Sequence, residues 1–108
     1  MKTLSRTEEL VLLSVAYLKE NAYGVSVRKH IMDLTEEDWS IGAIYVPLDR
    51  LTKWGFLDAL KGEPTAERGG RRKRYYRLTK AGWKALCHTR KINRKFWNDI
   101  PQPDFEKE

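Results

Sequence analysis

Residues 62–79, GEPTAERGGRRKRYYRLT, carry the most specific structural pattern in this chain of 108 residues. Segments 56–61 and 74–78 have the composition of short strands, and turn-forming glycine and proline residues lie between them. Strands separated in this way pair with each other in antiparallel fashion. We therefore predict a two-stranded hairpin whose tip is long and flexible.

Three helices are predicted before the hairpin. Ser5 and Glu8 have the spacing of a capping box and begin a helix that ends near residue 21. A second helix follows the Tyr-Gly pair at 23–24 and continues to residue 35. Ser40 caps a third helix, which Gly55 ends just before the first strand.

One long helix is predicted after the hairpin. Thr79 offers its N-cap, and the helix stops before Pro101. The order of elements is that of a mainly α (α+β) winged helix-turn-helix with a C-terminal helix. We expect residues 1–79 to form the DNA-binding domain, 80–100 a dimerisation helix and 101–108 a flexible tail.

Positive charge is concentrated in the second half of the chain. Between Arg68 and Asn98 there are twelve Lys or Arg residues and no Asp or Glu, whereas nine basic and fifteen acidic residues occupy the rest. A segment of net charge +12 beside a remainder of −6 favours a polyanion that approaches from one side. The alternative is that the basic run only keeps one face solvated.

The third helix is the candidate for insertion into the DNA major groove. Its helical spacing predicts that Ile41, Ile44, Leu48 and Leu51 face the core, and Pro47 predicts a kink or a locally loosened helix. Small residues in its first turn permit a close approach to DNA, or else relieve packing against a neighbouring helix. The predicted DNA-binding residues of this helix are Ser40, Gly42, Ala43, Tyr45, Val46, Arg50 and Lys53.

The hairpin is predicted to be the wing of the fold. Arg68, Arg71, Arg72 and Lys73 surround two glycines, and long cationic side chains on a bending tip reach phosphates or a narrow minor groove. We expect these four residues to supply affinity and register on double-stranded DNA. Tyr75, Tyr76 and Leu78 are expected to hold the hairpin on its domain.

The last helix has one apolar face and one basic face. We predict that its apolar face forms the seam of a homodimer, which would place two third helices on a palindromic site. The alternative is that this face folds back on its own domain. The predicted dimer-interface residues are Ala85, Leu86, Thr89, Ile92, Asn93, Phe96, Trp97 and Ile100.

Several other classes of protein do not fit the composition. Cys87 is the single cysteine, and with only His30 and His88 beside it no metal site or disulfide is expected. The sequence has no apolar run of about eighteen residues, the length that a membrane-spanning helix needs, so a cytoplasmic protein is expected. No nucleophile and base pair, phosphate loop or carboxylate pair stands out, so we predict neither an enzyme nor a cofactor.

These residues resemble the PadR-like family of bacterial winged-helix transcriptional regulators, in particular its compact branch with a single C-terminal helix. The resemblance covers about residues 8 to 90, and the wing is its specific part. Here Ala43 stands where many relatives have Thr or Ser, and Val46 follows Tyr45 where they have proline. The matching residues are Tyr23, Gly24 and Val25, then Gly42, Ala43, Ile44, Tyr45, Leu48, Arg50, Leu51 and Gly55, and finally 62–79 with Gly82.

The resemblance implies a homodimer that represses promoters and, in some members, releases DNA when a small aromatic effector binds. It also implies that Tyr45, its neighbours and the wing bases contact DNA. In compact members that bind drugs, a central tryptophan of the last helix stacks on the ligand. Asn93 holds that position here, and Trp97 follows one turn later. The aromatic residues of the last helix motivate the alternative function, a ligand-sensing or protein-interaction module that binds aromatic molecules at the dimer interface.

Overall fold

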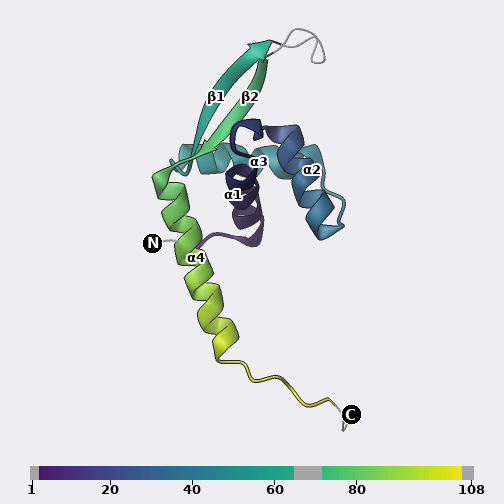
Figure 1. The fold of residues 1–108 in the computed structure, drawn as a ribbon, viewed down its shortest axis with the longest axis vertical. Coiled ribbons are helices and arrows are strands. Elements are labelled where there is room, and N and C mark those ends of the chain that lie inside the picture. Colours follow the sequence, from purple (N-terminus) through teal and green to yellow (C-terminus); the bar gives the residue numbers. More distant parts are fainter. Residues whose placement is uncertain (1–2, 65–71, 106–108) are drawn as a thin grey trace.

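The computed structural model describes residues 3–64 and 72–105. In these residues a bundle of short helices sits against a hairpin, and a long helix leaves the bundle at the base of the hairpin (Figure 1). The elements are α1 (Arg6–Leu18), the 3-10 turn η1 (Lys19–Asn21), α2 (Gly24–Thr35), α3 (Ile41–Lys53), β1 (Leu57–Pro64), β2 (Arg72–Leu78) and α4 (Lys80–Asn98). This order confirms the predicted winged helix-turn-helix.

The helices begin at the caps that the sequence predicts. The Ser5 hydroxyl accepts from the Glu8 backbone N–H at 3.1 Å, and the Glu8 carboxylate accepts from the Ser5 N–H at 2.9 Å. Ser40 caps α3 and Thr79 caps α4 through equivalent hydroxyl contacts. Gly55, at φ +81°, turns the chain from α3 into β1, a backbone conformation that glycine adopts without strain.

The hairpin is held on the helices through its middle. Its pairing runs from Leu57 opposite Leu78 to Pro64 opposite Arg72, with an irregularity after Lys61. The Tyr76 side chain is fully buried, and its backbone N–H donates to the Ala22 carbonyl at 2.9 Å. Both strands extend further toward the tip than predicted. Of the segment 62–73 between the predicted strands, which was expected to form the flexible tip, residues 65–71 lie outside the described residues.

The core lies where α1, α2, α3 and the base of the hairpin meet. The prediction that Ile41 is a core residue is wrong, since it is 47% exposed in the first turn of α3, beyond the edge of the bundle. The helix continues unbroken through Pro47, which is buried. The apolar core consists of Leu4, Val11, Leu12, Val15, Ala22, Val27, Ile31, Ile44, Leu48, Leu51, Leu57, Tyr76, Ala85 and Leu86.

The two halves of α4 have different surroundings. Ala85, Leu86 and Thr89 are buried against their own domain, and the Thr89 hydroxyl accepts from the Leu4 backbone N–H at 3.0 Å. The structure thus corrects the predicted dimer seam for these three residues, because the fold-back alternative holds for the first half of α4. The second half extends away from the bundle (Figure 1).

Within residues 3–64 and 72–105, no helix combines the length and the apolar character that crossing a membrane requires.

Candidate nucleic-acid interface

The outward face of α3 is largely aliphatic in its first two turns. Gly42 and Ala43 are exposed, and a Cβ added to Gly42 would meet open space. Val46 is 56% exposed one turn further on. Lys53 is exposed in the last turn. Most of the α3 residues that are predicted to contact DNA are therefore accessible to a DNA duplex.

Tyr45 lies differently from its exposed neighbours on α3. Its side chain is half-buried and packs against the core. A Cβ added to Gly24, the first residue of α2, would overlap the Tyr45 ring. The close approach of this ring to the start of α2 fixes how α3 crosses α2, which explains why the position before Val25 is a glycine.

Arg50 is held by a carboxylate of α1. Its guanidinium Nη1 donates to Glu8 Oε2 at 3.0 Å, while the other oxygen of the same carboxylate completes the capping box. Burial raises the pKa of the Glu8 carboxyl, but hydrogen bonds from the Ser5 N–H and Arg50, with the positive charge of Arg50, bring it below its ordinary value. Arg50 thus joins α3 to α1, a role the sequence did not indicate.

This ion pair predicts a pH-dependent contribution to stability. Because the folded-state pKa of Glu8 is depressed, its stabilisation is fully present above the ordinary value of 4.5 and is lost as pH falls through the folded pKa. We expect Glu8→Gln to lower the free energy of unfolding by about 1–2 kcal/mol at pH 7. Urea denaturation should show the difference from wild type shrinking below pH 4.5. A difference that stays constant into acid, or one equal to that of the exposed control Glu37→Gln, contradicts the assignment.

Two contacts tie the basic strand β2 to the helices. Arg74 Nη1 lies 3.7 Å from Asp49 Oδ1 of α3, and Lys73 Nζ lies 4.4 Å from the centroid of the Tyr23 ring. Both pairs are exposed or half-exposed, so they orient the strand more than they stabilise it. They place the basic strand beside α3. The contact of Asp49 with Arg74 was not predicted from the sequence. The signal that could have indicated it is a carboxylate on a helix face that was predicted to contact DNA, a polyanion.

Three of the four predicted wing residues have no described side chains. Arg68 and Arg71 lie outside the described residues, and for Arg72 the structure gives only its pairing with Pro64. Lys73, the fourth, is half-buried in β2. Their contribution to an interface therefore stays a prediction from charge and position.

A second exposed surface lies on the far half of α4. In α4, Phe96 is 74% exposed, Trp97 is 78% exposed and Ile92 is half-exposed, and Ile100, just after the helix ends, is 63% exposed. Asn93 is exposed as well. Large exposed apolar side chains at neighbouring positions of the chain are typical of an interface.

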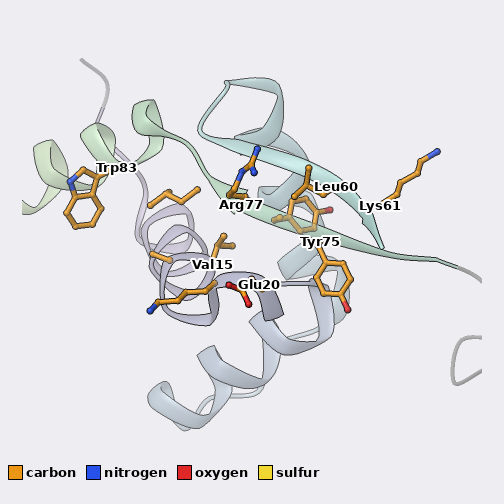
Figure 2. Close-up of a pocket in the computed structure, with 11 residues that line it drawn as sticks. Val15, Glu20, Leu60, Lys61, Tyr75, Arg77 and Trp83 are labelled. Atoms are coloured by element: carbon orange, nitrogen blue, oxygen red, sulfur yellow. The ribbon is translucent and has the colours of Figure 1, made fainter. Parts of the chain in front are cut away.

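A groove of about 660 Å³ lies between the hairpin, the end of α1 with η1, and the start of α4. Trp83 and Tyr75 lie at opposite ends of it, with Val15 and Glu20 between them (Figure 2). Its walls are mostly apolar, with cationic side chains at the rim. It is lined by Val15, Ala16, Lys19, Glu20, Leu60, Lys61, Tyr75, Tyr76, Arg77, Leu78 and Trp83.

An exposed third helix beside a basic hairpin is the arrangement of a winged-helix protein that binds DNA. Residues 12–88 match the model of the transcriptional regulator PadR-like family. The chain therefore belongs to the PadR-like family of transcriptional regulators, which are DNA-binding proteins and not enzymes.

Three solved structures of similar fold are also described as transcriptional regulators. A transcriptional regulator from Clostridium thermocellum is 24% identical, with a TM-score of 0.65 over 93% of this chain and 100% of that one. A PadR-like regulator from Bacillus cereus is 20% identical, with a TM-score of 0.66 over 90% and 92%. A PadR family regulator from Clostridium difficile is 21% identical, with a TM-score of 0.60 over 87% and 88%. None of the curated proteins compared with the chain matches it.

Proposed function

We propose that this PadR-like regulator is a cytoplasmic repressor that binds a palindromic operator as a homodimer. The observation that carries the proposal is the accessible face of α3 lying beside the basic strand β2. In this arrangement α3 enters the major groove and the wing contacts phosphates on one side of it. A repressor acts by occupying a promoter, so the proposal needs no further activity than tight and specific DNA binding.

Selection of duplexes from a random library tests this proposal. Purified protein is incubated with the library at about 0.15 M salt, and bound duplexes are sequenced over several rounds. The expected result is an inverted repeat with half-sites about one helical turn apart. A reporter gene behind the enriched site should then be expressed less when the regulator is present. Enrichment of no sequence rejects the proposal, and higher reporter expression rejects repression.

The far half of α4 is proposed as the dimer contact. Phe96, Trp97 and Ile100 are each more than half exposed, and burying such side chains against a second copy contributes about 1.5–3 kcal/mol each. Phe96→Glu should convert a dimer to a monomer in sedimentation at micromolar concentration. Leu34→Glu is the matched control, because Leu34 is also about three-quarters exposed but lies on α2. A dimer that survives Phe96→Glu, or a wild-type monomer, contradicts this contact.

The groove at the hairpin favours a second function, the sensing of a small aromatic effector. A largely apolar hollow of about 660 Å³ has the size of ordinary ligand pockets, and Trp83 offers a ring for stacking. Because the groove joins the hairpin to α1 and α4, a ligand bound there would bias the position of the wing.

Tryptophan fluorescence distinguishes this groove from the dimer seam as the effector site. A planar aromatic ligand should quench the fluorescence of wild type and Trp97→Phe, and the quenching should be lost in Trp83→Phe. The reverse pattern would place the ligand at the α4 seam instead. Absence of saturable quenching in wild type contradicts effector binding at either place.

A further inference from the structure

Three of the polar or aromatic side chains on α3, before the exposed Lys53 of its last turn, have partners within the protein. Arg50 donates to Glu8 at 3.0 Å. Asp49 lies 3.7 Å from an Arg74 guanidinium nitrogen. The Tyr45 ring is packed at Gly24. Side chains that read base edges by hydrogen bonds must reach them, and each of these three would first have to leave its contact within the protein.

The side chains that remain in the first two turns of α3 are aliphatic. Ile41, Ala43 and Val46 are exposed, and Gly42 has no side chain. The Ser40 hydroxyl accepts from the Ala43 backbone N–H as the helix cap. Recognition helices place their N-terminal residues against base edges, so in this chain the base edges would meet methyl groups rather than amides or guanidinium groups.

We propose that this regulator selects its operator by apolar contact between the Val46 methyls and the 5-methyl groups of thymines. This inference rests on the proposed function, since it assumes that α3 enters the major groove. Thymine is the base that presents a methyl group there, and small apolar side chains recognise it by excluding water. Val46 lies one turn after Gly42 on the outward face, and the bare backbone at Gly42 allows the helix to approach the bases closely.

The expected size of the effect follows from the burial of one methyl group. Removing a buried methyl costs about 0.8 kcal/mol, which corresponds to a three- to fivefold loss of affinity for each contacted thymine. Thymines that α3 does not touch should tolerate the same change. The effect is therefore confined to particular positions, repeated symmetrically in the two half-sites.

Replacement of thymine by deoxyuridine tests the contact directly, because it removes only the 5-methyl group and keeps the hydrogen-bonding pattern and charge. Each thymine of the duplex enriched from the random library is replaced singly, and affinity is measured by fluorescence anisotropy. One or two positions in each half-site should lose three- to fivefold. The exposed position of Val46 makes Val46→Ala compatible with folding, which thermal melting verifies.

The Val46→Ala variant completes a double-mutant cycle with each sensitive thymine. At these thymines the loss on deoxyuridine substitution should shrink to less than about 1.5-fold in Val46→Ala, whereas it should persist in the control Lys53→Ala. A specific operator that tolerates deoxyuridine everywhere, or a sensitivity unchanged by Val46→Ala, overturns the thymine contact and leaves the proposed function standing. Failure to enrich any duplex overturns the proposed function itself.

Discussion

Replacing Arg71 and Arg72 together by alanine should weaken DNA binding on the order of 30-fold at about 0.15 M salt, equally for the operator and for random duplex. Each arginine that neutralises a phosphate releases counterions, so losing two should flatten the slope of log affinity against log salt by about 1.8. The loss is independent of sequence because phosphates are the same at every position. Anisotropy titrations between about 0.1 and 0.3 M salt measure both quantities.

A matched control separates the wing from net charge alone. Lys80→Ala with Lys84→Ala removes the same charge from the first half of α4, which follows the base of the hairpin and not its tip, and both residues are exposed there. This pair should change affinity and salt slope much less than the wing pair. Equal losses for the two double variants would mean that the wing contributes only to overall charge and makes no phosphate contacts.

Adding one methyl group at Gly82 should destabilise the protein more than any surface change. Gly82 is buried in the first turn of α4, and a Cβ there would overlap the Phe56 carbonyl oxygen and stand 2.8 Å from Leu78 Cδ1. The backbone must shift to admit it, because a carbonyl cannot rotate away as a side chain would. We expect Gly82→Ala to cost about 2–3 kcal/mol and to lower Tm by roughly 10–20 °C in a thermal melt.

Gly42→Ala is the matched control, because Gly42 also lies in the first turn of a helix but has open space around it. Alanine there should raise stability by up to about 1 kcal/mol. The same substitution should weaken operator binding roughly tenfold, since the new methyl lies between α3 and the groove. A Gly82→Ala variant as stable as Gly42→Ala would contradict the close contact of α4 with Phe56.

The order of the elements and the starts of the capped helices could be predicted because their signals are local. Ser5, Ser40 and Thr79 each cap a helix whose first turn follows within three residues. The composition of the strands and the glycine and proline residues between them identified the hairpin. These signals depend on neighbours along the chain, so no knowledge of the packing was needed to read them.

The surroundings of individual side chains could not be predicted in this way. Glu8 lies 42 residues before its partner Arg50, and nothing in the helical pattern of either segment pairs them. The apolar face of α4 was recognised, but the pattern cannot say that Leu86 meets its own domain while Trp97 meets solvent. Likewise Ile41 has core spacing and extends beyond the core.

These tertiary contacts change the reading of the candidate interface. Tyr45 and Arg50 are among the α3 residues that the sequence predicts to contact DNA, whereas the structure packs the first at Gly24 and pairs the second with Glu8. Val46 remains the most accessible large side chain near the start of α3. Specificity is therefore expected to come from apolar contact and DNA shape more than from hydrogen bonds to bases.

The central claim is that α3 and the wing together bind DNA with sequence specificity. It is tested most directly by the ratio of affinities for the enriched operator and for a random duplex of equal length, measured by anisotropy at about 0.15 M salt. The account predicts a ratio of about 1,000 or more, of which Val46→Ala removes a part while Arg71→Ala with Arg72→Ala leaves it unchanged. A ratio near one would contradict the account.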